Sequence, residues 1–173
     1  MRRLRGSFCC TALAWLTALA AGTSAREIAP EIAHQPAHCT IPGSPISVCA
    51  AVSDDGQVVK VRAFFRPEGE RYFSFVEMAP RDERYCGTLP APREGRMKQL
   101  EYYVWAVDDE YLPQRTTPFL LELSEEGACS FPPLERDPKR AASITVHATH
   151  SGQGDELDAD FERAGVTFVR RGR

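Results

Sequence analysis

The sequence predicts an all-β protein built as an antiparallel β-sandwich. Between residues 45 and 129, short segments alternate apolar with polar residues, which is the pattern of strands buried on one face. Turn residues separate these segments about every 8 to 12 positions, as in sandwich proteins. No segment between them has a convincing helical period. Together these observations favour two packed sheets over a fold that contains helices.

Six strands are expected in this region. In the expected strand 46–52 the apolar residues share one face, and a turn follows at 53–56. In the expected strand 59–65, Val59 begins the buried face, while Lys60 and Arg62 lie on the other. The remaining expected strands cover residues 71–78, 84–89, 100–107 and 116–123.

The N-terminus has the pattern of a cleavable secretory signal peptide, residues 1–25. Arginines at the start precede an apolar run at 8–21, and small residues follow, ending at Ala25. The run is shorter than the roughly 20 residues that cross a bilayer, which disfavours a retained anchor. No second apolar run approaches membrane length, so we expect no stable membrane span after cleavage. The protein is therefore predicted to be periplasmic or secreted.

The charge of the mature chain excludes one class of partner. Cleavage removes three of 21 basic residues and none of the 24 acidic ones, which leaves a net charge of −6. Nucleic-acid binding depends on clustered Lys and Arg, so we expect no nucleic-acid partner.

Cysteine usage agrees with export. The four cysteines Cys39, Cys49, Cys86 and Cys129 remain after cleavage, and an even count in an exported chain predicts two disulfides. Four cysteines allow three disulfide connectivities, and their number alone does not choose among them. Because the spacings contain no C-x-x-C, neither a zinc site nor thiol redox chemistry is indicated, and no cofactor or metal is expected.

Two flanking regions show weaker patterns. Residues 26–44 are Pro-containing and indicate an extended leader that either lies on the domain or hangs free. Residues 130–173 form a C-terminal extension with two weaker strand candidates, 143–149 and 166–169, on either side of a polar, acidic loop at 151–162. Whether these two strands dock on the sandwich edge or stay loosely ordered is left open.

The late strands carry a family resemblance. Thr88-Leu89-Pro90-Ala91-Pro92, followed by Leu100-Glu101-Tyr102-Tyr103-Val104-Trp105-Ala106-Val107-Asp108, resembles the signature of bacterial immunoglobulin-like and fibronectin-type-III-like modules. The resemblance covers about residues 46–123 and implies an immunoglobulin-like sandwich. It does not extend to function, because this architecture carries many unrelated roles. The cysteines also depart from the antibody spacing, and residues from 130 onward lie outside the module.

The strand order of that family has two implications. It pairs the first strand with the fourth, which implies a Cys49–Cys86 bridge and leaves Cys39 to Cys129. It also brings the loops 53–57, 79–83 and 108–114 to one end of the sandwich. We call this end the acidic pole, and its residues are Asp54, Asp55, Asp82, Asp108, Asp109, Glu110 and Tyr111.

The acidic pole has two functional interpretations and one purely structural interpretation. Carboxylates there could bind a divalent cation or a basic partner surface. Turns are also rich in Asp for backbone reasons alone, and we favour this explanation because no loop has the ligand spacing of a calcium loop.

Aromatic and histidine residues are ambiguous in the same way. Trp105 and Tyr72, with other tyrosines, are candidates for a platform that stacks against sugar rings, although packing is the commoner role of strand aromatics. The pairs His34 with His38 and His147 with His150 lack a metal-binding frame, so surface positions are expected.

The sequence thus predicts an exported, monomeric, non-enzymatic binding or assembly module of the cell envelope. It lacks the nucleophile and phosphate-binding motifs of common enzymes. The expected partner is a protein recognised through the loop pole or a sheet edge. The alternatives are an accessory module that binds glycan or cell-wall polymer, and a small envelope hydrolase that uses the acidic pole.

Overall fold

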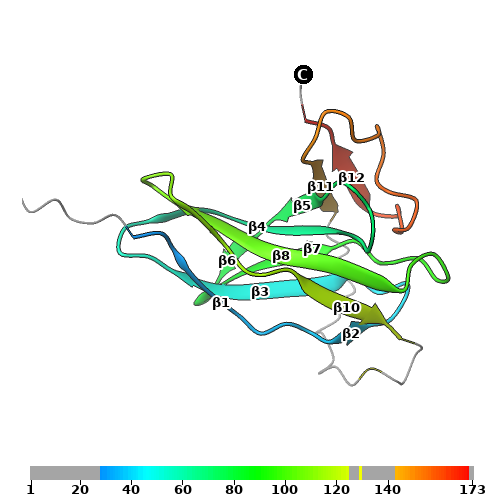
Figure 1. Ribbon diagram of the computed structural model, residues 1–173, viewed down its shortest axis with the longest axis horizontal. Coiled ribbons are helices and arrows are strands. Elements are labelled where there is room, and N and C mark those ends of the chain that lie inside the picture. Colours follow the sequence, from blue (N-terminus) through cyan, green and yellow to red (C-terminus); the bar gives the residue numbers. More distant parts are fainter. Residues whose placement is uncertain (1–27, 125–128, 130–142, 172–173) are drawn as a thin grey trace, which may run out of the picture.

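The computed structural model describes residues 28–124, 129 and 143–171. Within these residues all regular structure is β, and two sheets pack face to face (Figure 1). The first sheet has the strand order β1 (Glu31–His34), β3 (Ile46–Ser53), β7 (Arg84–Leu89) and β6 (Ala79–Arg81). The second has the order β12 (Val166–Val169), β11 (Ile144–Ala148), β5 (Ser74–Glu77), β4 (Val58–Pro67), β8 (Gln99–Asp108), β10 (Phe119–Leu123) and β2 (Cys39–Thr40), with β9 (Pro113–Arg115) also paired to β8.

Alternation along the strands places the core between the sheets, as the sequence predicts. In β8 every second residue is buried, from Leu100 through to Ala106, while the residues between them face outward. The long neighbour β4 buries Val61, Ala63 and Phe65 in the same way. The all-β sandwich is therefore confirmed. Two of its strand pairs, β2 with β10 and β11 with β12, are parallel rather than antiparallel.

The expected buried position of Val59 is wrong. Val58 pairs with Asp108, but the next paired residue of β4 is Lys60, opposite Val107, so Val59 is the extra residue of a β-bulge. A bulge breaks the two-residue alternation, and Val59 is consequently 53% exposed. The single strand expected at 71–78 also differs, because β5 belongs to the second sheet while the chain continues into β6 of the first.

The segment before β3 lies on the domain. β1 pairs with β3 in the first sheet, and β2 pairs with β10 in the second, so the chain crosses from one sheet to the other. Pro30 is fully buried and Thr40 is 5% exposed. The expected leader is therefore part of the sandwich from residue 28 onward. The predicted signal peptide and residues 26–27 lie outside the described residues.

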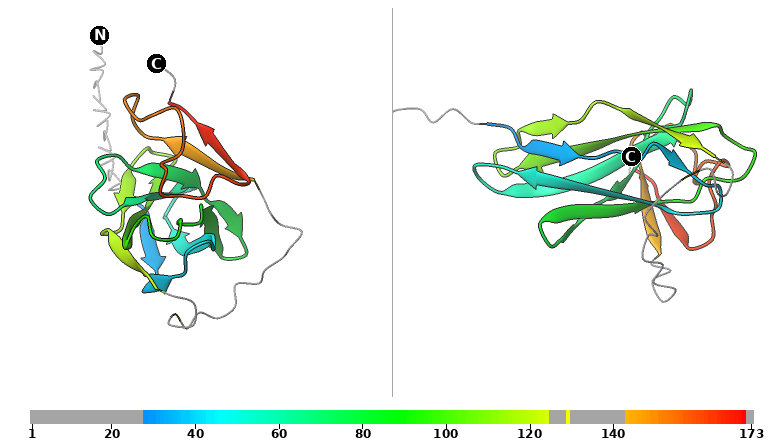
Figure 2. Two further views of the ribbon diagram at one scale, coloured as in Figure 1. Left: turned by 90° about the vertical axis from the view of Figure 1, so that its right-hand side faces the viewer. Right: turned by 90° about the horizontal axis from the view of Figure 1, so that it is seen from below.

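The C-terminal extension shares the hydrophobic core. β11 pairs with β5 and β12 with β11, and Figure 2 shows both strands at one side of the sandwich. The loop between them contributes Leu157 and Phe161, which are 4% and 1% exposed. The ring of Phe161 meets that of Phe65 edge to face at 5.2 Å, and Phe161 also bridges to Pro92. A loop that reads as polar and acidic thus supplies two core residues.

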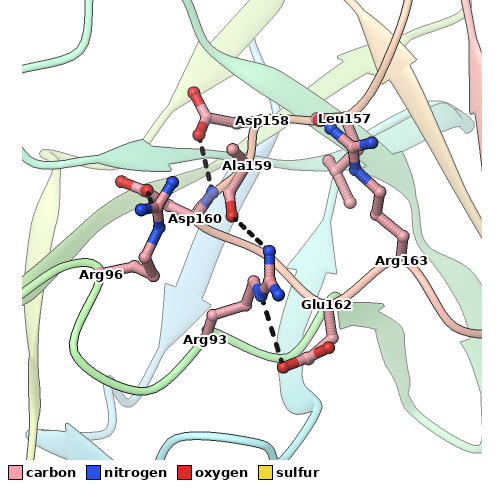
Figure 3. Close-up of polar contacts among 8 residues, drawn as sticks. All are labelled: Arg93, Arg96, Leu157, Asp158, Ala159, Asp160, Glu162 and Arg163. Atoms are coloured by element: carbon pink, nitrogen blue, oxygen red, sulfur yellow. Dashed lines mark hydrogen bonds and ion pairs between the residues drawn. The ribbon is translucent and has the colours of Figure 1, made fainter.

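Ion pairs hold the same loop against the connection between β7 and β8. The Nε atom of Arg93 lies 3.7 Å from Glu162 Oε1, and its guanidinium also donates to the carbonyl oxygen of Ala159 (Figure 3). The Nε atom of Arg96 lies 3.5 Å from Asp160 Oδ1. These pairs are solvent-exposed, so they contribute little free energy. The burial of Phe161 and Leu157 is the larger stabilising effect.

Both expected disulfides are present. Cys49 and Cys86 are directly opposed on β3 and β7, with Cα atoms 4.1 Å apart. Since Val48 and Ala50 point into the core, this bridge lies on the outer face of the first sheet. Cys39 of β2 is bonded to Cys129, across a sequence separation of 90 residues.

Candidate functional site

The three turns of the acidic pole lie at one end of the sandwich. The β3–β4 and β8–β9 turns meet there, because β4 and β8 are antiparallel neighbours and Val58 pairs with Asp108. The β6–β7 turn is at the same end of the first sheet (Figure 1). The expected clustering of the loops therefore agrees with the arrangement of the strands.

Within this pole there is a small hollow, and only some of the residues expected at the pole line it. It is lined by Asp54, Asp55, Gly56, Asp109 and Glu110. Asp82 is on the β6–β7 turn and does not line it. The hollow is therefore formed by two turns rather than three.

One carboxylate holds the β3–β4 turn, and another joins it to the β8–β9 turn. Asp54 Oδ2 accepts a hydrogen bond from the backbone N–H of Gly56 at 3.0 Å, and Asp109 Oδ1 accepts one from Gln57 at 3.1 Å. A side chain at position 56 would place its Cβ 2.8 Å from Asp109 Oδ1, so this carboxylate would have to shift from its position beside Gln57. The interpretation of these acids as turn-forming residues thus accounts for part of the pole.

Asp108 is not a surface residue of the pole. It is 2% exposed, and its Oδ1 accepts hydrogen bonds from the backbone N–H groups of Glu110, at 3.0 Å, and Leu112, at 2.8 Å. This carboxylate therefore holds the β8–β9 turn from inside. The expectation that Asp108 faces a ligand needs correction, because the last residue of a strand that alternates inward also points inward.

Tyr111 is the most exposed large apolar residue among those described. It is 84% exposed at the tip of the β8–β9 turn, with a backbone φ of +64°. Bulky residues seldom adopt this left-handed conformation, and the two hydrogen bonds to Asp108 on either side of Tyr111 hold it there. Val59 follows Val58, which pairs with Asp108, and Ile28 precedes β1, whose Glu31 pairs with Ser53, so both residues are near this end. They are 53% and 60% exposed.

The geometry provides little support for a metal site here. Among the described residues, no group of three or more His, Cys, Asp or Glu side chains is arranged to hold a metal ion. Two buried oxygens, Asp54 Oδ1 and Asp108 Oδ2, have no hydrogen-bond partner among those residues, but each belongs to a carboxylate whose other oxygen is bound to backbone.

The aromatic side chains form a row on the outer face of the second sheet. Phe64 of β4 stacks on Tyr103 of β8, with ring centroids 4.9 Å apart and an interplanar angle of 3°. Phe64 also contacts Phe75 of β5 at 5.3 Å, and Phe75 stacks on His147 of β11 at 4.9 Å. The row crosses four neighbouring strands and ties the C-terminal strand β11 to the middle of the sheet.

Each of the two candidate stacking residues has neighbours against its ring. The guanidinium of Arg62 lies 5.5 Å from the ring centroid of Trp105. Tyr72 stacks on His150 at 4.7 Å, and the guanidinium of Arg71 lies 5.0 Å from the Tyr72 ring. These contacts favour packing within the protein over a platform kept free for sugar stacking.

His34 is not the surface residue that the sequence predicts. Its Nδ1 lies 2.8 Å from the carbonyl oxygen of Cys49, and its Nε2 lies 3.0 Å from the hydroxyl of Tyr102. Burial lowers the pKa of His34, and the nearby positive charge of Arg84 acts in the same direction. His38 and His150 are exposed, whereas His147 is half-buried in the aromatic row. The alternation of residues 31–34 was a signal for β1, but the short segment contains only one strongly apolar residue, Ile32.

Comparison with known proteins leaves this geometry as the basis for a functional assignment. No protein-family model, curated protein or solved structure matches the chain. Within the described residues, no helix is long and apolar enough to cross a membrane.

Proposed function

We propose that this chain is an exported, non-enzymatic binding module that recognises a protein partner through the acidic pole. The observation that carries the proposal is Tyr111, an 84% exposed aromatic side chain on a turn whose backbone is held by the buried carboxylate of Asp108. Tyrosine is among the residue types that dominate binding energy at protein interfaces. A turn held in one conformation before binding also loses little entropy on association.

The surroundings of Tyr111 indicate the character of the partner. Val59 and Ile28 add exposed apolar surface at the same end, and Asp55 and Asp109 add negative charge. Opposite charge at the rim of an interface speeds association and selects among partners. The proposed partner therefore presents a pocket for an aromatic ring surrounded by Lys or Arg side chains.

Export is the second part of the proposal. Two disulfides join the four cysteines that remain beyond the expected signal peptide, and disulfides are typical of oxidising compartments. We infer a periplasmic or secreted protein from this and from the pattern of residues 1–25. Intact mass of the exported chain tests this part, with cleavage after Ala25 as the expected result.

The binding test compares three forms of the mature chain, tagged at the C-terminus because β1, the first described strand, begins opposite Ser53, beside the pole. Wild type, Tyr111→Ala and Leu120→Ala are used to capture proteins from the exported fraction of the source cells. Leu120, on β10, is a matched control because it is also exposed, at 51%, but lies on the outer face of the sheet away from the pole. The captured protein is then purified and titrated against each variant by calorimetry.

We expect a partner that binds wild type and Leu120→Ala equally but binds Tyr111→Ala about 30-fold more weakly, the effect of a hot spot worth about 2 kcal/mol. Its affinity should also fall as salt concentration rises, because the carboxylates contribute at long range. The proposal is wrong if no captured protein depends on Tyr111, or if Leu120→Ala has the same effect. Thermal melting of each variant verifies that the fold is intact.

A further inference from the structure

The edge strands of the two sheets differ in how well they are protected against pairing with another chain. β6 contains Pro80, β9 contains Pro113, β1 contains Glu31, and β2 has only two residues. Proline, charge and short length are devices that prevent edge pairing. β12, with the sequence Val-Thr-Phe-Val, contains neither proline nor charge, and no described strand pairs with its outer side.

The hydrogen bonding of β11 fixes which backbone groups of β12 point outward. The N–H of Ile144 donates to the carbonyl of Gly165 at 2.9 Å, and Ile144 is paired with Val166. In a parallel ladder alternate residues direct both of their backbone groups toward the neighbour. Thr167 and Val169 therefore face β11, whereas the N–H and C=O of Phe168 face the open side of the sheet.

β12 is also held firmly enough to act as a template. Val166 and Phe168 are partly buried and pack against the core, while Thr167 and Val169 are exposed, the latter at 38%. An added strand would thus meet a strand that is already in place rather than one that must first be ordered.

Positive charge flanks this edge on both sides. Arg163 precedes β12, and Arg170 and Arg171 follow it. Arg163 is paired with Glu156 at 2.6 Å and Arg170 with Asp155 at 2.7 Å, but both pairs are solvent-exposed and can be exchanged for other partners at little cost. Arg171 donates to the carbonyl oxygen of Thr149 and has no carboxylate partner among the described residues.

We propose that β12 is a second binding site, at which an extended peptide segment with carboxylates at its ends adds a strand to the sheet. The open backbone groups of Phe168 supply hydrogen bonds, and the flanking arginines select an acidic partner over a basic one. The same charges disfavour pairing of two copies of this chain through β12, because antiparallel pairing would bring the arginines of one copy beside those of the other.

The test measures backbone amide exchange by NMR in the full mature protein. The probe is a synthetic, end-blocked peptide of sequence Asp-Val-Thr-Val-Thr-Val-Asp, and its control has Lys in place of both Asp residues. Without peptide, we expect the Phe168 amide to exchange rapidly and the Thr167 and Val169 amides slowly. The acidic peptide should slow exchange at Phe168 at least about tenfold, while the Lys peptide should leave it nearly unchanged.

Two variants separate this site from the acidic pole. Arg171→Glu should weaken binding of the acidic peptide about fivefold, a typical effect of reversing one exposed charge. Tyr111→Ala should not change binding of the acidic peptide. The two proposals can therefore fail independently of each other. An unchanged Phe168 amide with saturating acidic peptide overturns the proposal. Protection of Phe168 that rises with protein concentration in the absence of peptide also overturns it, because this result would assign the edge to self-pairing.

Discussion

The Nε2 atom of His34 on β1 lies 3.0 Å from the hydroxyl oxygen of Tyr102 on β8, so this contact links the first sheet to the second. The other ring nitrogen, Nδ1, faces the carbonyl oxygen of Cys49, which can only accept a hydrogen bond. Nδ1 therefore carries the proton of the neutral ring, and Nε2 accepts from the tyrosine. Burial raises the pKa of Tyr102 to about 12, so its hydroxyl remains a donor at all ordinary pH values.

This contact predicts a loss of stability in mild acid. The pKa of His34 in the folded protein is lowered from 6.5, so between the two pKa values the unfolded chain binds a proton that the folded chain does not. The stabilising contribution is complete above pH 6.5, begins to be lost below it, and is gone below the lowered folded pKa. Denaturant midpoints measured from about pH 8 down to about pH 5.5 should decline over the lower part of that range.

Two glutamine variants identify the residue responsible. His34→Gln should flatten the decline, because glutamine does not titrate. His38→Gln should retain it, since His38 is exposed. Equal slopes for wild type and His34→Gln would show that the acid sensitivity arises elsewhere.

Phe161 should be among the most costly residues to truncate. Its side chain is 1% exposed and packs against Phe65, so Phe161→Ala leaves a cavity at the junction of the extension and the sandwich. We expect a loss of about 3 to 5 kcal/mol in the free energy of unfolding by urea denaturation. Val169→Ala, at a half-exposed position in the same extension, should cost less than about 1 kcal/mol. A small effect of Phe161→Ala would mean that the extension folds separately from the sandwich.

The Cys39–Cys129 bridge should stabilise the edge strand β2. Because this strand has only two residues, its pairing with β10 depends on few hydrogen bonds, one of which runs from Ser124 N–H to the carbonyl of Thr40. The double variant Cys39→Ala, Cys129→Ala should lose up to about 4 to 5 kcal/mol, the chain-entropy value for a loop of this length. Exchange of the Ser124 amide should accelerate more than that of core amides in β8. Uniform acceleration would instead indicate a global effect alone.

Several features of this protein were determined by the sequence itself. Alternation in 46–52 and 100–107 predicted β3 and β8, because a two-residue period has one structural solution when only one face is buried. The disulfide pairing followed from the strand order that the family resemblance implied. The co-location of two acidic turns also followed, since antiparallel neighbours bring alternate turns to the same end.

Other features depended on contacts between residues far apart in the chain, which a local pattern does not carry. Val59 reads as a buried strand residue, and only the pairing of β4 with β8 shows that a bulge turns it outward. Phe161 stands in a polar loop with no period, and its burial depends on a gap beside Phe65 and Pro92 that the other strands create. Asp108 reads as a surface acid, yet the inward direction of its position in β8 makes it the internal support of Tyr111. Local alternation thus determined which segments form strands. Tertiary packing decided which residues became core, support or surface, because burial depends on what the rest of the chain places opposite each side chain.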